Sequence, residues 1–136
     1  MYVTNYNVNR NNKMNLLLIT KPDQNRSSLL SFLSSHQIDF DTAENQLIGI
    51  QKAYQSQYDV VVLDAEEESY QIDKAIRILK ERNPKVRIIV RTEHNTRELE
   101  IKIRKESIFY YHVNSFGNQE FSSALSSALE LDKKVH

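Results

Sequence analysis

The stretch "YDVVVLDAEEES", residues 58–69, decides the fold. Four apolar residues in a row, Val60 to Leu63, lead to one aspartate, Asp64, and three glutamates follow at positions 66–68. A continuous apolar run, without alternation, is typical of a strand that is covered on both faces of a sheet. We therefore predict a buried strand that presents Asp64 at its carboxyl end. Comparable short runs occur at Leu16–Ile19, Ile38–Phe40, Val86–Val90 and Ile108–Val113.

Stretches with helical spacing separate these runs. Their apolar residues recur at intervals of three and four over residues 25–36, 44–55, 70–82 and 119–131. Strands that alternate with amphipathic helices indicate βαβ units and a parallel sheet. We predict a doubly wound (βα)5 fold of the α/β class, in which a five-stranded parallel sheet lies between two layers of helices, a three-layer α/β/α arrangement.

One segment departs from this rhythm where the fourth helix should lie. In "RELEIKIRKE", residues 97–106, Leu99, Ile101 and Ile103 alternate with charged residues, which is the periodicity of a strand. Leu99 and Ile103 are four residues apart and can share one face of a helix, which leaves Ile101 outside that face. We favour a short helix with one poorly buried isoleucine. The alternative is an apolar patch that binds a partner.

Composition excludes several classes of function. The chain has 136 residues, which fits one domain, and its 18 basic and 18 acidic residues give no net charge. This balance gives no reason to expect a nucleic-acid or membrane partner. The absence of cysteine excludes disulfides, zinc–thiolate sites and thiol nucleophiles. The two glycines do not lie in a phosphate-binding pattern, which argues against a nucleotide-binding loop.

The sequence also indicates where the domain begins and ends and where in the cell the protein is found. The asparagine-rich start, residues 1–13, is predicted to be a flexible tail, and the domain itself to span residues 14–132. No apolar run is long enough to span a bilayer, and the N-terminus lacks the apolar core of a secretion signal. We therefore expect a cytoplasmic protein.

The residues that end the predicted strands form a candidate pocket. In open parallel sheets, ligands bind at the carboxyl ends of the strands, where the connecting loops meet. We assign five polar residues at those ends to the pocket: Thr20, Lys21, Asp64, Thr92 and Asn114. The four histidines lack the spacing of a metal site, so we predict no metal ligand and no cofactor.

With this layout, residues 14–131 resemble the receiver domains of response regulators, such as those of chemotaxis. These are flavodoxin-like modules that histidine kinases phosphorylate in two-component signalling. In "VVVLD", Asp64 stands where the family carries its phospho-acceptor. In "RIIVRT", Thr92 stands where a hydroxyl binds the phosphoryl group, and in "FYYHVNSF", Tyr111 stands at the place of an aromatic switch residue. The resemblance implies these roles.

The sequence departs from the family at the groups that handle charge. An acidic pair that holds Mg²⁺ is replaced by Thr20 and Lys21, and a lysine that contacts the phosphoryl group is replaced by Asn114. Mg²⁺ prefers carboxylate oxygens, which a hydroxyl and an ammonium group do not supply. We predict that Lys21 forms an ion pair with Asp64 that acts as a structural lock, and that nearby Asp23 caps the following helix.

These departures favour a degenerate receiver, or pseudo-receiver, that is not an enzyme. It would act in signal transduction through protein–protein interaction, with a histidine kinase or another regulator as partner. The alternative is a phosphorylatable receiver that accepts a phosphoryl group on Asp64 from a histidine kinase, and self-phosphorylation at Asp64 would then be the only reaction that it catalyses. A weaker third hypothesis is a small-ligand sensor that uses the candidate pocket.

The expected interaction surface is built from the fourth helix, the fifth strand and the fifth helix, which receivers commonly use for pairing, and a homodimer through this surface is one option. In this chain the surface would include Leu99, Ile101, Arg104, Tyr110 and His112. We expect His112 at the surface or at an edge of the sheet, and we favour a packing role for Tyr110 and Tyr111.

Overall fold

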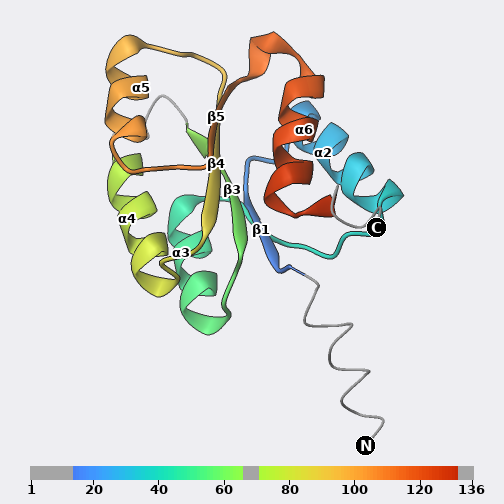
Figure 1. Ribbon diagram of the computed structural model, residues 1–136, viewed down its shortest axis with the longest axis horizontal. Helices are drawn as coiled ribbons and strands as arrows, with labels where there is room; N and C mark the ends of the chain where they lie inside the picture. Colours follow the sequence, from blue (N-terminus) through green and yellow to red (C-terminus); the bar gives the residue numbers. More distant parts are fainter. Residues whose placement is uncertain (1–13, 66–70, 132–136) are drawn as a thin grey trace, which may run out of the picture.

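A computed structural model describes residues 14–65 and 71–131 of the chain. It contains one parallel sheet with the strand order β2-β1-β3-β4-β5, which confirms the predicted α/β fold. Figure 1 shows this sheet between two layers of helices. The strands are β1 (Leu16–Ile19), β2 (Asp41–Ala43), β3 (Val60–Ala65), β4 (Arg87–Thr92) and β5 (Tyr110–Val113).

The helices divide between the two faces of the sheet. Helices α2 and α6 cover one face, and α3, α4 and α5 cover the other (Figure 1). The bounds are α2 (Gln24–Ser35), α3 (Gln46–Gln55), α4 (Ile72–Arg82), α5 (Arg97–Arg104) and α6 (Asn118–Ala128), with a short 3-10 helix η1 (Asn114–Phe116) after β5. As predicted, Asp23 caps α2, since its carboxylate accepts a hydrogen bond from the backbone N–H of Arg26.

The central strand β3 contributes to both halves of the core. Val61 and Leu63 pack with the helices α3, α4 and α5, whereas Val60 and Val62 pack with α2 and α6. Successive side chains of a strand point to opposite faces, so a strand covered on both sides must be apolar at every position. The apolar run that predicted this strand therefore reflects its central place in the sheet.

Two expectations about local structure have different outcomes. The second strand, expected at Ile38–Phe40, lies instead at Asp41–Ala43, where it pairs with β1. The apolar character of Ile38 and Phe40 comes from their packing against the α2–α6 side of the core, and not from a strand. The segment that alternates charged and apolar residues is helix α5, as favoured, and its Ile101 remains 46% exposed.

Some expectations concern residues outside the described ranges. The predicted tail, residues 1–13, and the last residue of the domain predicted at 14–132 lie there, so both stay predictions. Within residues 14–65 and 71–131, every helix is too short or too polar to cross a membrane.

Candidate functional site

Asp64 lies near the carboxyl end of β3, next to the last residue of that strand. Its side chain follows Val60 and Val62 on the face that α2 and α6 cover, because alternate residues share a face. The carboxylate is only 15% exposed. A carboxylate so far removed from water requires hydrogen-bond donors from the protein.

Arg91 provides the main partner of this carboxylate. The two residues are direct neighbours in the pairing of β3 with β4. Nε of Arg91 donates to Oδ1 of Asp64 at 2.8 Å, and Nη2 donates to Oδ2 at 3.2 Å. The side chain of Arg91 is itself only 4% exposed. This is a two-pronged guanidinium–carboxylate pair, the strongest geometry that arginine forms with a carboxylate.

The predicted ion pair between Lys21 and Asp64 is corrected by this arrangement. Lys21 contacts Asp64 through its backbone N–H, which lies 3.4 Å from Oδ2, and the guanidinium of Arg91 supplies the positive charge. Asp64 does have a cationic partner, but that partner is Arg91 and not Lys21. The sequence signal for it is an arginine inside the apolar run "RIIVRT", one residue before Thr92.

Aromatic side chains cover the Asp64–Arg91 pair. The guanidinium of Arg91 lies over the ring of Phe121 in α6, with its central carbon 5.2 Å from the ring centre. His112 is the neighbour of Arg91 on β5, and its ring lies 5.4 Å from that of Phe121. These contacts close the site on the side of α6.

His112 was expected at the surface or at an edge of the sheet; it lies in the edge strand β5, but it is not at the surface. The residue is 2% exposed, because its side chain points from β5 toward α6 and packs beside Phe121. Its Nδ1 has no hydrogen-bond partner in the described part of the chain. Of the residues assigned to the interaction surface, Ile101 and Arg104 are exposed, whereas Leu99 and Tyr110 are partly exposed.

Burial shifts the pKa values of Asp64 and His112 in opposite directions. It raises the pKa of Asp64 above its ordinary value of 3.8, while the guanidinium of Arg91 and the N–H of Lys21 limit that rise. It lowers the pKa of His112 below its ordinary value of 6.5, and the charge of Arg91 lowers it further. The imidazole of His112 is therefore neutral at neutral pH.

The remaining pocket residues are engaged in local contacts. The hydroxyl of Thr92 donates to the backbone carbonyl of His94 at 3.2 Å. The backbone N–H of Thr20 donates to the carbonyl of Ala43 at 3.1 Å, whereas its buried hydroxyl has no partner in the described part of the chain. The side chain of Tyr111 is buried, and its hydroxyl donates to the side-chain oxygen of Asn95 at 2.7 Å.

Glu93 is a residue of this edge that the sequence did not single out. Its Oε1 accepts hydrogen bonds from the side-chain amides of Asn25 in α2 and Asn114 in η1. The carboxylate thus connects the start of α2, the loop after β4 and the start of η1. Asn114, at the position of the family's lysine, is used in this bridge.

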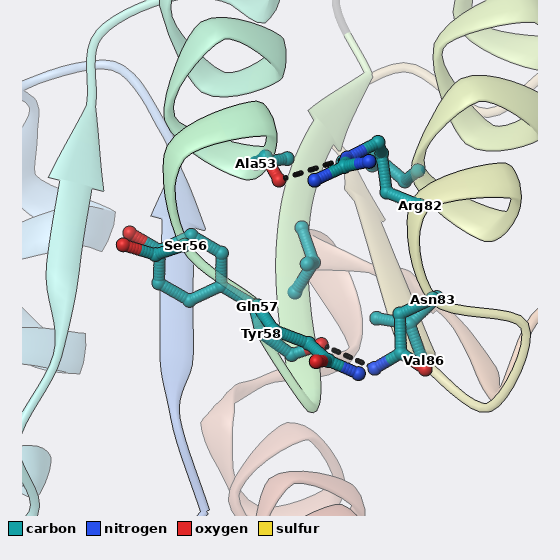
Figure 2. Close-up of a pocket in the computed structure, with 9 residues that line it drawn as sticks. Ala53, Ser56, Gln57, Tyr58, Arg82, Asn83 and Val86 are labelled. Atoms are coloured by element: carbon teal, nitrogen blue, oxygen red, sulfur yellow. Dashed lines mark hydrogen bonds between the residues drawn. The ribbon is translucent and has the colours of Figure 1, made fainter.

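Two other features bear on ligand binding. Among residues 14–65 and 71–131, no three histidine, aspartate or glutamate side chains lie close enough together to hold a metal ion. A cavity of about 50 Å³ lies at the amino ends of β3 and β4. Figure 2 shows the residues that line it. Small-molecule pockets are usually about 300 Å³ or more. The cavity belongs to the seam where Arg82 and Asn83 donate to the carbonyls of Ala53 and Tyr58.

Comparisons with known proteins bear on the fold. No protein-family model matches the chain, and no curated protein matches it. The chain is similar to the beryllofluoride-activated NtrC4 receiver domain dimer, with 23% identity, a TM-score of 0.74, and coverage of 85% of this chain and 96% of that chain. A response regulator from Thermotoga maritima gives 14% identity, a TM-score of 0.74, and coverage of 87% and 98%. HP1043, an orphan response regulator of H. pylori, gives 17% identity, a TM-score of 0.73, and coverage of 85% and 96%.

These likenesses show that the chain has the fold of response-regulator receiver domains. They confirm the flavodoxin-like architecture that the sequence predicted. Identities of this size carry the fold and leave the function to be argued from the site itself.

Proposed function

We propose that the protein is a degenerate receiver domain, a pseudo-receiver that transmits signals through protein–protein interaction without Mg²⁺-dependent phosphorylation of Asp64. The observation that carries this proposal is the two-pronged pair between Asp64 and Arg91. Both carboxylate oxygens are occupied by donors of one buried guanidinium. A hydrogen bond from a guanidinium draws electron density from the oxygen that accepts it, so either oxygen of Asp64 is a weaker nucleophile toward phosphorus than a free carboxylate oxygen.

The charges around Asp64 also oppose phosphoryl transfer. That reaction depends on positioning and on neutralising the charge of the phosphoryl oxygens, a task that Mg²⁺ and a lysine perform in receivers. Here Thr20 and Lys21 replace the acidic pair, and Asn114 is hydrogen-bonded to Glu93. The carboxylate of Glu93 adds negative charge at the edge where a phosphoryl group would have to bind.

A specific observation favours the alternative function. Arg91 places a permanent positive charge beside Asp64, and an arginine can neutralise a phosphoryl group as well as a carboxylate. In this alternative, an oxygen of Asp64 attacks the phosphorus of a phosphohistidine, the P–O bond of an acyl phosphate forms and the P–N bond breaks. The departing imidazole takes up a proton from water and leaves as neutral histidine. One neighbour in fold is a response regulator from Burkholderia pseudomallei with a phosphorylated aspartic acid and a calcium ion.

The partner of the pseudo-receiver is a protein, such as a histidine kinase or another regulator in the cytoplasm. Its surface on this chain is the face formed by α5, β5 and α6, where Leu99, Ile101, Arg104 and Tyr110 have exposed or partly exposed side chains. His112 is buried and does not contribute to that face. We assign no catalytic activity and no cofactor to the chain.

The test is a phosphorylation assay on three proteins. Wild type, Asp64→Ala and Arg91→Met are incubated with acetyl phosphate and Mg²⁺, and their intact masses are measured. We expect no added phosphoryl group on wild type. An adduct on wild type that is lost in Asp64→Ala would establish the alternative function.

The Arg91→Met variant tests the reason given for the absence of phosphorylation. If the guanidinium blocks the oxygens of Asp64, its removal frees them, and any adduct should appear in this variant alone. Circular dichroism checks that the variant is folded, since its Asp64 carboxylate loses the charged partner. An adduct of equal amount on wild type and Arg91→Met would show that the pair does not prevent the reaction.

A further inference from the structure

Helix α5 carries an exposed stripe of three residues: Glu98, Ile101 and Lys105. Their spacing is i, i+3 and i+7, so they lie in one row along the helix. Lys105 has helical backbone angles, with φ −65° and ψ −19°, and continues the row past the last residue of α5. The stripe therefore has an acid at one end, an apolar centre and a base at the other end.

The centre of the stripe is not used by the core. Ile103 is fully buried and Leu99 packs partly against the core, whereas Ile101 is 46% exposed. Ile101 lies in a groove of about 420 Å³ between α4 and α5, two helices that lie on the same face of the sheet (Figure 1). The other residues lining the groove are all charged: Asp73, Arg77, Glu98, Lys102, Lys105 and Glu106.

The charges of the groove fall into two groups. Those along its walls pair with one another, since Arg77 binds Asp73 at 3.2 Å and Glu106 at 2.7 Å, and Lys102 lies 3.5 Å from Asp73. Among the described residues, Glu98 and Lys105 form no ion pair with another side chain. The two ends of the stripe therefore carry opposite charges that are available to a partner.

We propose that the occupant of this groove is a second copy of the chain, with the two α5 helices antiparallel about a two-fold axis near Ile101. In this arrangement Glu98 lies against Lys105 of the partner subunit, and Lys105 lies against Glu98 of the partner subunit. Both pairs form together because the spacing of the charges, about 10.5 Å along the helix, is the same in the two copies. Ile101 packs against Ile101 of the partner subunit and against the aliphatic stem of the neighbouring lysine.

A two-fold contact requires a surface that is complementary to itself. The same patch meets itself, so a patch of one sign would be repelled by its copy. The groove instead has three acidic and three basic residues, and the stripe has one of each. A negative residue and a positive residue on opposite sides of an apolar centre are self-complementary in the antiparallel orientation and in no parallel one.

This inference rests on the proposed interaction function and names one partner for it. The contact differs from the predicted face of α5, β5 and α6, because it uses α4 and leaves out Tyr110 and Arg104. It does not depend on the state of Asp64. A failure of the dimer would leave the phosphorylation result unchanged, so the two proposals can be told apart.

The experiment is sedimentation velocity on the full chain over a range of about 1 µM to 1 mM. Four samples are compared: wild type, Glu98→Lys, Lys105→Glu, and an equimolar mixture of the two variants. We expect a concentration-dependent dimer for wild type and a dimer weakened about 10-fold or more for each variant, since each places like charges opposite one another twice. The mixture should recover the affinity, because one variant has two basic ends on its stripe and the other has two acidic ends, so both pairs attract.

A matched control uses Lys85→Glu, a charge reversal at an exposed residue between α4 and β4 that does not line the groove. Lys85→Glu should dimerise as wild type does. Arg104→Glu, on the face of α5 toward Tyr111, separates this contact from one through α5, β5 and α6. A wild type that is monomeric throughout the range would overturn the proposal. So would a mixture that dimerises no better than its components, or a dimer that Arg104→Glu breaks and Glu98→Lys leaves intact.

Discussion

The two faces of the sheet differ in what they bury at its carboxyl edge. Toward α3, α4 and α5, the central strand presents Val61 and then Leu63, both within one apolar cluster. Toward α2 and α6, the same strand presents Val60 and Val62 and then the charged Asp64. The α3–α5 face stays apolar to the end of the strand. The α2–α6 face instead ends in the ion pair of Asp64 with Arg91, which lies beneath the aromatic ring of Phe121.

The neighbouring strands repeat this change on the same face. Strand β4 contributes Ile89 and then Arg91, and β5 contributes Tyr110 and then His112. An apolar cluster is stabilised by filling its volume, and most of its contacts are interchangeable. A buried charge depends on one particular partner. On the α2–α6 face, the loss of stability caused by one substitution should therefore depend on whether the charged partner of the substituted residue is still present.

The largest effect is expected for Arg91→Met. The substitution keeps the length of an apolar stem but leaves the carboxylate of Asp64 buried without its cation. Breaking a buried ion pair by removal of one partner costs about 3–5 kcal/mol. We expect a loss of that size in the free energy of unfolding, measured by urea titration followed by circular dichroism.

The control is the double variant Asp64→Leu with Arg91→Met, which replaces the whole pair by apolar groups. Because both charges are gone, most of the stability lost in the single variant should return. If the double variant were as unstable as Arg91→Met, the loss would come from packing around Phe121, and the two faces would be alike in kind.

An effect of intermediate size is expected when the pH is lowered, because protonation of His112 should reduce the free energy of unfolding. Its pKa is lowered in the folded protein, so the unfolded chain binds a proton that the folded chain does not. The stability from the neutral imidazole is complete above the unfolded value of 6.5 and is lost as pH falls below it. We expect the free energy of unfolding to fall by up to about 1.4 kcal/mol per pH unit in that window.

His112→Phe isolates this contribution, because phenylalanine keeps an aromatic ring beside those of Tyr110 and Phe121 and does not titrate. Its unfolding free energy should be flatter than that of wild type below pH 6.5. Asp64 acts with the opposite sign, since its raised pKa favours the folded state at acid pH and this gain is lost as pH rises through the folded value. An equal slope in wild type and His112→Phe would contradict the assignment to His112.

The fold could be predicted because it depends on which residues are buried. The apolar run of β3 and the helical spacing of α4 report burial directly, and the cap at Asp23 follows from local chemistry. The error at β2 has the same origin. Ile38 and Phe40 are apolar because they pack on the core, and the edge strand beside them, Asp41–Ala43, needs little apolar surface.

The candidate site was only partly predictable because it depends on pairing between strands. The sequence placed Asp64 at a strand end and indicated that it needs a cation. Which cation meets it is set by the register of β3 with β4, which brings Arg91 directly opposite. Periodicity along one strand carries no information on that register. Glu93 was missed for the same reason, since its two amide partners are 68 and 21 residues away.

The smallest change in the free energy of unfolding is expected for a substitution at Thr20, and this change should be a gain in stability. Its hydroxyl is buried and has no hydrogen-bond partner among the described residues, whereas the hydroxyl of the similarly buried Thr92 donates to the carbonyl of His94. Thr20→Val removes an unpaired polar group and should raise the free energy of unfolding by up to about 1 kcal/mol. Thr92→Val breaks a hydrogen bond and should lower it by about 1 kcal/mol.

Urea unfolding of these two variants compares the same chemical change at two strand ends of one edge. If Thr20→Val lost stability as Thr92→Val does, the hydroxyl of Thr20 would have a partner in the folded protein, and this end of β1 would belong to the hydrogen-bonded network that holds Asp64. A gain at Thr20 would instead limit that network to Arg91 and the backbone N–H of Lys21, because a hydroxyl that stabilises the carboxylate could not be removed without loss.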